Sequence, residues 1–298
     1  MRANQTSLIL LLMCFLAFSS GCNSNSTSTE ENIPKVESEE NISTVKSVDG
    51  NSIFYETRGE GDTTIVFVHC WTCNSSFWQP QIEYFSQNYQ VVRLDLAGHG
   101  KSEGKRPQYT MAAFGKDVAA VVNEVATDKV ILVGHSMGGP VVIEAAKLLG
   151  DRVVGIVGVD VFYTPFEYPT SETEIAAFVQ PFKDDFSSAS EELVRSMFTP
   201  AADPQLIEST IKQMGSANPE MAVSAITEIF TWNAQQGAAD LAQFSSKLRN
   251  INGAPTGQEN ALHESVILIP GVGHFVAQAK PSEFNQTLEQ IITEFETN

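Results

Sequence analysis

The chain of 298 residues is 42% hydrophobic, which is enough for one large globular domain, and its formal net charge is −18 at pH 7. An acidic surplus of this size argues against nucleic acid and anionic membrane surfaces as partners, because both bind through positive patches. The four cysteines come without an accompanying Cys/His set, so neither a metal site nor a cofactor is expected.

Residues 1–22 have the pattern of an export signal. Arg2 precedes an apolar run over residues 8–18, and small residues then lead to Cys22. This run is too short for a membrane span, which needs about 20 residues. The ending resembles a bacterial lipoprotein signal, in which the cysteine becomes the lipidated first residue. Cys22 is therefore the predicted lipidation site, and plain secretion is the alternative.

Residues 23–44 are predicted to form a disordered tether. Asn, Ser, Thr and Glu dominate this stretch, which cannot bury enough apolar surface to offset the entropy of ordering. A tether behind a lipidated cysteine would hold an exported domain on the periplasmic or outer surface of a bacterial membrane. The oligomeric state is not indicated.

From residue 45 onward, predicted strands and helices alternate. Asp49-Gly50 separates two alternating segments and predicts a hairpin over 45–57. The further predicted strands are 65–68, 91–94, 130–133, 153–159, 247–252 and 266–269. The predicted helices are 111–126, one that begins at Met137, and 281–295. This alternation indicates a parallel sheet with helices on both faces.

The pattern G-x-S-x-G occurs at residues 134–138, between a predicted strand and a predicted helix. Glycines leave room for a sharp strand-to-helix turn that presents the serine hydroxyl instead of packing it. The helix that follows adds its dipole and its free N–H groups at the same point, where an oxyanion would form. Ser136 is therefore the predicted nucleophile.

Cys70 and Cys73 form a C-x-x-C pair. Thioredoxin-like redox chemistry would need this pair at the start of a helix in another fold context. Outside the cytoplasm either of two states is consistent with the sequence: a Cys70–Cys73 disulfide or free buried thiols.

Residues 161–243 interrupt the alternation and are mostly helical in pattern, with prolines that mark turns. The aromatic and methionine residues of this stretch either line an apolar acyl pocket or pack its own core, and we expect core packing for most of them. They are Phe162, Tyr163, Phe166, Tyr168, Phe178, Phe182, Phe186, Met197, Phe198, Met214, Phe230 and Trp232.

Four motifs, at residues 69–71, 95–100, 134–139 and 271–275, make the chain resemble the α/β-hydrolases in their order and spacing. The resemblance implies a mostly parallel, doubly wound sheet with a helical cap inserted after the sixth strand. The core would then comprise residues 45–160 and 244–298, and the cap residues 161–243. The same scaffold hosts many reactions, so the resemblance does not define a substrate.

By the same resemblance, the oxyanion hole consists of the backbone N–H groups of Trp71 and Met137. Cys70 stands where the family usually has glycine. If the backbone there needs a positive φ, cysteine costs about 1 kcal/mol, whereas the N–H donors survive the change.

His274, in a glycine-rich loop after the last strand, is the predicted general base, because serine needs a base to become a good nucleophile. The acid that orients it should lie between Ser136 and His274 in chain order. Residues 252–258 contain no carboxylate, so Asp160, at the end of the sixth strand, is the predicted acid. Glu259 is the alternative acid, and helix capping is the alternative role for Asp160.

The predicted function is hydrolysis of carboxylic esters of small to medium apolar molecules by a Ser-His-Asp triad, as in carboxylesterases and lipases. Perhydrolysis without a cofactor, C–C bond hydrolysis and lactone hydrolysis are alternatives on the same fold, and a non-catalytic binding protein is a further one. Epoxide hydrolases and dehalogenases of this fold use aspartate as the nucleophile, and Ser136 argues against both.

Overall fold

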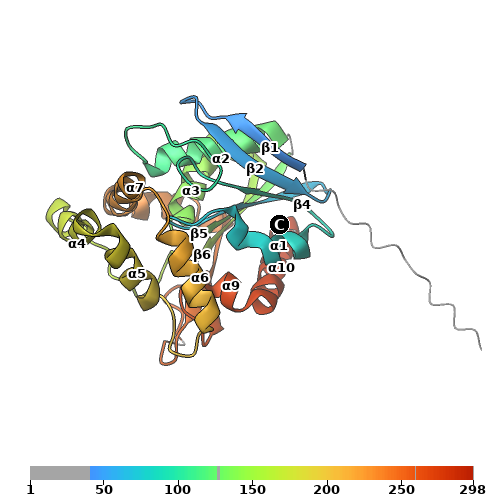
Figure 1. Cartoon of the computed structure of the whole chain (residues 1–298). Coiled ribbons are helices and arrows are strands. Elements are labelled where there is room, and N and C mark those ends of the chain that lie inside the picture. Colours follow the sequence, from blue (N-terminus) through green and yellow to red (C-terminus); the bar gives the residue numbers. More distant parts are fainter. Residues whose placement is uncertain (1–40, 126–127, 259, 298) are drawn as a thin grey trace, which may run out of the picture. The chain divides into compact units, whose positions relative to one another are not determined.

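The computed structural model describes residues 41–125, 128–258 and 260–297. Within these ranges one eight-stranded sheet has the order β1-β2-β4-β3-β5-β6-β7-β8 (Figure 1). The strands are β1 (Asn41–Lys46), β2 (Ser52–Arg58), β3 (Thr63–Val68), β4 (Gln90–Leu94), β5 (Lys129–His135), β6 (Val153–Val159), β7 (Leu248–Ala254) and β8 (Val266–Pro270). Strand β2 is antiparallel to its two neighbours, and the pairs from β4 through β8 are parallel.

The predicted hairpin is present, but it begins earlier than expected. Asn41 already pairs with Thr57, so the predicted end of the tether at residue 44 was wrong. Most side chains of β1 are exposed, and its ladder uses backbone groups that leave no apolar pattern in the sequence. The rest of the predicted tether, together with residues 1–22, lies outside the described residues.

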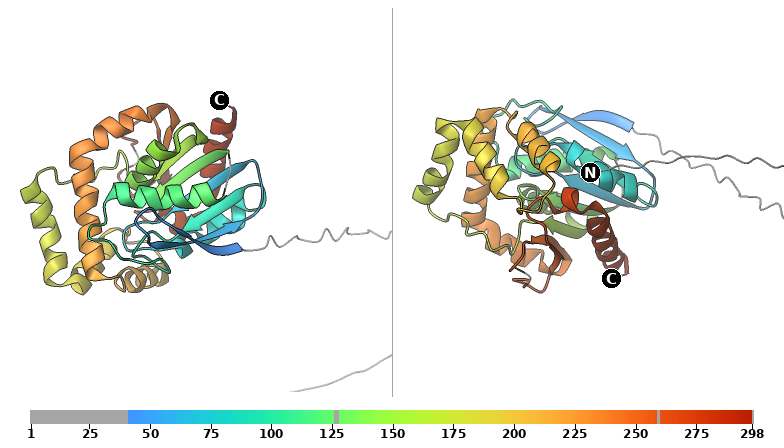
Figure 2. Two further views of the ribbon diagram at one scale, coloured as in Figure 1. Left: turned by 90° about the horizontal axis from the view of Figure 1, so that it is seen from above. Right: turned by 60° about the horizontal axis from the view of Figure 1, so that its bottom comes forward.

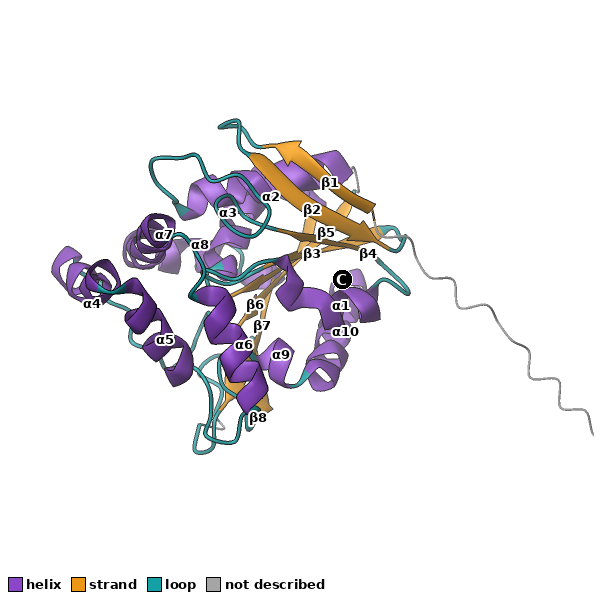
Figure 3. Cartoon of the chain, in the orientation of Figure 1, coloured by secondary structure: helices purple, strands orange, loops and turns teal. Residues whose placement is uncertain are grey.

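Alternate side chains of the central strands pack into two separate cores. In β3, Val66 and Val68 belong to one core, whereas Ile65 and Phe67 belong to the other. Helices α2 (Met111–Val125) and α3 (Gly138–Leu149) cover the first face, and α1 (Gln79–Phe85) and α10 (Pro281–Thr297) cover the second (Figure 3). Covered on both faces, the central strands β3, β5 and β6 are almost entirely buried, whereas the edge strand β8 is partly exposed.

Between β6 and β7 the chain forms a helical insertion, residues 161–243, beside the carboxyl ends of the parallel strands (Figure 2). Its helices are α4 (Glu172–Asp184), α5 (Phe186–Ser196), α6 (Pro204–Met214), α7 (Pro219–Trp232), the π-helix η3 (Asn233–Gly237) and α8 (Ala238–Gln243). Pro204 and Pro219 open helices, as prolines often do, whereas Pro181 lies inside α4, where a turn was expected. No helix in the described ranges is long and apolar enough to cross a membrane.

Helix α3 holds the insertion through a buried carboxylate. Glu144 accepts a hydrogen bond from the indole Nε1 of Trp232 at 2.7 Å, and it forms an ion pair with Lys147 at 2.8 Å. Lys147 also pairs with Asp240 on α8 at 2.5 Å. These contacts link the helix that follows Ser136 directly to the insertion.

The short elements complete the fold: the 3₁₀ segments η1 (Ser75–Trp78), η2 (Gly150–Arg152) and η4 (Ser245–Lys247), and helix α9 (Val276–Ala279). The predicted fold class, a mostly parallel sheet with helices on both faces and an insertion after the sixth strand, is confirmed.

Candidate active site

Ser136 occupies a sharp turn between β5 and α3. Its φ of 53° lies in the left-handed region that L residues rarely adopt, and its N–H donates to the Val159 carbonyl at 3.0 Å. A Cβ at Gly134 would collide with the Gly138 carbonyl, and one at Gly138 would lie 2.6 Å from the Val68 carbonyl oxygen. Glycine at both positions is therefore what lets the turn bring Ser136 out of the strand.

A cavity of about 460 Å³ lies between the strand ends and the insertion. Five of the predicted site residues line it: Ser136, His274, Asp160, Trp71 and Met137. They follow four different parallel strands, and the carboxyl ends of such strands meet at one edge of the sheet. In the described part of the chain, no three or more His, Cys, Asp or Glu side chains are arranged to hold a metal ion.

Asp160 and His274 are hydrogen-bonded across 114 residues of sequence. The Asp160 Oδ2 atom lies 2.6 Å from the His274 Nδ1 atom, and the two side chains are only 15% and 16% exposed. The other carboxylate oxygen, Oδ1, accepts the Gly253 N–H at 2.8 Å. Asp160 caps no helix, since Ser171 is the N-cap of α4, the next helix along the chain. Glu259 lies outside the described residues.

His135 holds the loop that carries His274. Its Nε2 lies 2.9 Å from the His274 carbonyl oxygen, so Nε2 must carry the proton and donate. The two imidazole rings are 4.7 Å apart, and the His274 N–H donates to the Met197 carbonyl at 2.9 Å. The residue beside the serine in the turn thus also fixes the backbone of the histidine.

The two backbone segments that carry the predicted oxyanion donors lie against each other. A Cβ at Gly138 would meet the carbonyl oxygens of both Val68 and His69, just before Trp71. Within the described residues, neither the Trp71 N–H nor the Met137 N–H has a hydrogen-bond partner. The expected strain falls elsewhere: Thr72, not Cys70, has a positive φ, of 54°. Cysteine at position 70 therefore costs nothing in backbone strain.

His69 fixes the orientation of the peptide that joins Cys70 to Trp71. The Leu96 N–H donates to His69 Nε2 at 3.0 Å, so the imidazole proton must sit on Nδ1. That Nδ1–H donates to the Cys70 carbonyl oxygen at 2.8 Å.

Three histidines around the site are buried: His69, His99 and His135. Burial is the largest cause that lowers the pKa of each, because the charged imidazolium loses its hydration. The negative charge of Asp95 opposes the lowering of the His69 pKa, whereas neighbouring His274 adds to the lowering at His135. All three rings therefore stay neutral in the folded protein near neutral pH.

The unfolding free energy is expected to decrease as the pH falls below about 6.5. Below that pH the histidines of the unfolded chain take up protons, whereas the same histidines in the folded chain stay neutral. The folded state therefore keeps its full stability above the unfolded pKa and loses it as the pH falls toward the lowered folded pKa. Each histidine contributes up to about 1.4 kcal/mol per pH unit. Urea unfolding of the wild type and of His99→Gln, at about pH 7.5 and about pH 5.5, measures this dependence. An unchanged pH slope in His99→Gln would contradict the assignment.

The cavity wall is mainly apolar and comes from the insertion. Of the twelve aromatic and methionine residues singled out there, seven line the cavity: Phe162, Phe166, Tyr168, Phe178, Met197, Phe230 and Trp232. Eleven of the twelve, all but Phe166, also belong to the buried hydrophobic core or pack against it. The expected core packing is therefore confirmed, and it does not exclude a place in the cavity wall. Burial raises the pKa of Tyr168 to about 12, with the negative charge of Asp160 contributing, so this phenol keeps its proton.

Sequence reasoning missed several aliphatic lining residues. Ile226 and Ile229 on α7 and Leu193 on α5 all reach the cavity. The i, i+3 spacing of the two isoleucines places them on one helix face and was the available signal. Nothing in the sequence indicated that this face meets the strand ends.

Residues 65–287 match the model of the alpha/beta hydrolase family. The match covers well over half of the chain, which therefore belongs to this family and is a hydrolase of the α/β fold.

Solved structures share this fold at low sequence identity. A thermophilic esterase from Thermogutta terrifontis is 21% identical, with a TM-score of 0.72 over 86% of this chain and 99% of that one. An enzyme that degrades N-acyl homoserine lactones is 24% identical, with a TM-score of 0.68 over 83% of this chain and 99% of that one. A bromoperoxidase from Bacillus anthracis is 21% identical, with a TM-score of 0.72 over 85% of this chain and 100% of that one.

Proposed function

We propose that the protein is a serine hydrolase of carboxylic esters that uses Ser136, His274 and Asp160 as a catalytic triad. The observation that carries the proposal is the 2.6 Å hydrogen bond between Asp160 Oδ2 and His274 Nδ1, in a cavity that Ser136 also lines. Because the carboxylate accepts at Nδ1, the imidazole keeps Nε2 free to act as a base.

In the proposed reaction, His274 takes the proton of the Ser136 hydroxyl while the serine oxygen attacks the ester carbonyl carbon. The negative charge that develops on the carbonyl oxygen is stabilised by the N–H groups of Trp71 and Met137. The alcohol leaves with the proton from His274, and an acyl-enzyme remains. Water, deprotonated by the same histidine, then releases the carboxylic acid and regenerates the serine.

The apolar wall favours esters with an apolar acyl or alcohol part. A lactone is a cyclic ester and would follow the same steps, so lactones belong to the same proposal. The insertion supplies most of this wall, through residues 161–168 and helices α4, α5 and α7. We assign residues 161–243 the role of a cap that excludes water from the reacting groups.

The kcat/KM for p-nitrophenyl esters is expected to rise with acyl chain length until the cavity of about 460 Å³ is filled. Each buried methylene contributes about 0.8 kcal/mol, which is about a fourfold gain per carbon. A series from acetate to decanoate measures this, with an N-acyl homoserine lactone as a cyclic comparison. Equal kcat/KM across the series would contradict an apolar acyl pocket, and hydrolysis of none of these esters would refute the proposed function.

For localisation, we propose that the protein is exported and anchored to a bacterial membrane through lipidated Cys22. The support is the order of Arg2, the apolar run at 8–18 and the small residues before the cysteine. The several acyl chains of a lipoprotein bind membranes firmly, whereas a single chain binds only marginally.

Cys22→Ser is expected to move the protein from the membrane fraction to the soluble fraction. Detergent partitioning of the full-length wild type and variant, followed by mass spectrometry of the mature amino terminus, measures this change. A wild type that is soluble, or a variant that stays in the membrane, would favour plain secretion or another means of attachment.

A further inference from the structure

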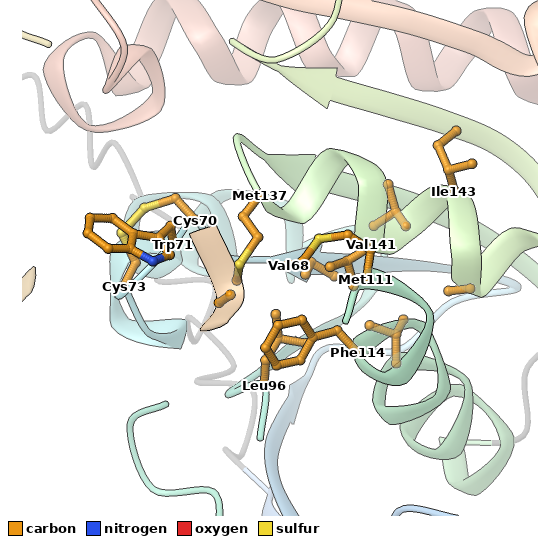
Figure 4. Close-up of a cluster of buried hydrophobic side chains, with 14 of the residues drawn as sticks. Val68, Cys70, Trp71, Cys73, Leu96, Met111, Phe114, Met137, Val141 and Ile143 are labelled. Atoms are coloured by element: carbon orange, nitrogen blue, oxygen red, sulfur yellow. A yellow bond between two sulfur atoms is a disulfide. The ribbon is translucent and has the colours of Figure 1, made fainter. Parts of the chain in front are cut away.

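A disulfide closes the loop after β3, where Trp71 lies. It joins Cys70 to Cys73, with Cα atoms 5.2 Å apart, and both side chains are 2% exposed. Figure 4 shows the two cysteines around Trp71 within a cluster of buried side chains that also contains Met137. The proposed triad chemistry makes no use of these sulfur atoms, so their position beside the oxyanion donor needs its own explanation.

The Cys70 carbonyl and the Trp71 N–H belong to one planar trans peptide, in which they point in opposite directions. Whatever holds this carbonyl therefore also directs the N–H. Two donors hold it: His69 Nδ1 at 2.8 Å and the Cys73 N–H at 3.2 Å. The second of these contacts is made by a residue of the disulfide itself.

The loop conformation is not one that its sequence favours. Thr72 is β-branched and has a φ of 54°, which is a strained backbone conformation for such a residue. A covalent link across Thr72 removes extended conformations in which the Cys73 N–H would leave the Cys70 carbonyl. The disulfide thus keeps a strained turn closed next to the proposed oxyanion site.

The Trp71 side chain is anchored on the opposite side, in the helical insertion. Its indole Nε1 donates to the Ala222 carbonyl on α7 at 2.8 Å, and its ring packs edge-on against Phe182 at 5.5 Å. The insertion fixes the Trp71 indole, and the disulfide loop fixes the Cys70 carbonyl. Together these contacts determine the direction of the Trp71 N–H.

From these contacts we infer that the Cys70–Cys73 disulfide is the positioning device of the oxyanion hole, and that its reduction switches the enzyme to a form of low kcat. This inference rests on the proposed ester hydrolysis. In the switch, a dithiol reductant breaks the S–S bond and becomes a cyclic disulfide, while its two protons and two electrons produce two thiols, at Cys70 and Cys73.

The first experiment reduces the purified full-length wild type with dithiothreitol. Alkylation and mass spectrometry count the thiols gained, and kcat and KM are measured with the best p-nitrophenyl ester. Once two thiols have been gained, kcat is expected to fall by at least about tenfold, toward the 10²- to 10³-fold that loss of one oxyanion donor causes, while KM changes less than about threefold. Reoxidation should restore kcat.

Cysteine variants locate the effect. Cys70→Ser and Cys73→Ser should have the low kcat without reductant and show no further response to it. The matched control, Cys22→Ser, should keep the full kcat and the full sensitivity to dithiothreitol. Phenylboronic acid, which forms a tetrahedral adduct with an active serine, should bind more weakly in proportion to the loss of kcat, whereas binding of the carboxylic acid product should not change.

The outcomes separate the inference from the proposed function. An unchanged kcat after two thiols are gained, or a loss of kcat that follows the loss of the folded circular dichroism signal, overturns the positioning role. An oxidised wild type that hydrolyses no ester and takes up no fluorophosphonate refutes the proposed function instead. Active cysteine variants that still respond to reductant also overturn the inference.

Discussion

Ser136→Ala is expected to lower the kcat of ester hydrolysis by at least about 10⁴-fold while leaving the fold intact. Its hydroxyl lines the cavity and supplies chemistry, whereas alanine keeps the Cβ that the backbone at φ 53° already tolerates. Initial rates with p-nitrophenyl esters and thermal unfolding measure the two effects separately. His274→Ala should lose a comparable amount, since nucleophile and base act as a unit.

Ser196→Ala is the matched control for this prediction. Ser196 lines the same cavity, but it lies on α5, and its hydroxyl donates to the Leu193 carbonyl at 2.7 Å, so no chemistry is expected of it. A fluorophosphonate should label the wild type and Ser196→Ala, and leave Ser136→Ala unlabelled. Ser136→Ala with most of the wild-type kcat would end the serine mechanism, and a non-catalytic role would gain ground if the wild type stayed unlabelled.

Much of the fold could be predicted from the sequence because the decisive elements are local. The buried strand β3 contains a continuous apolar run, and the turn at Gly50 is formed by Asp49-Gly50, a dipeptide typical of hairpin turns. Helix α1 was missed, since its seven residues give little periodicity, and β1 began earlier than expected because backbone pairing leaves no mark in an exposed strand. Local patterns therefore identified the sheet, and tertiary pairing decided its edges.

The site, too, was only partly predictable from local sequence. The sharp turn at Ser136 is a local motif, and Asp160 was chosen as the acid because no carboxylate follows the seventh strand. By contrast, the proton donation from His135 to the His274 carbonyl joins residues 139 apart in the sequence. The apolar cavity wall and the contacts that hold the Trp71 peptide and indole likewise depend on how the insertion packs against the sheet. No single segment of the sequence predicts that packing.

Asp160→Asn is expected to lower kcat by about 10⁴-fold with little change in stability. Asparagine tolerates the left-handed backbone that position 160 requires, where φ is 46°, and its carbonyl can still accept the Gly253 N–H, which lies 2.8 Å from the present Oδ1. The amide NH₂ then faces His274 Nδ1. That nitrogen must accept instead of donate, so the imidazole proton moves to Nε2, where it blocks removal of the Ser136 proton.

Glu259→Gln, measured in parallel, decides between the two candidate acids, because residue 259 lies outside the described residues. We expect its kcat to stay within about threefold of the wild type, since Asp160 Oδ2 already occupies the 2.6 Å contact with His274 Nδ1. Thermal unfolding of both variants shows whether a lost rate reflects chemistry or a lost fold. A large loss only in Glu259→Gln would transfer the role of the acid to Glu259. Small losses in both would mean that some other group orients His274 during the reaction, and that the observed contact with Asp160 only stabilises the loop.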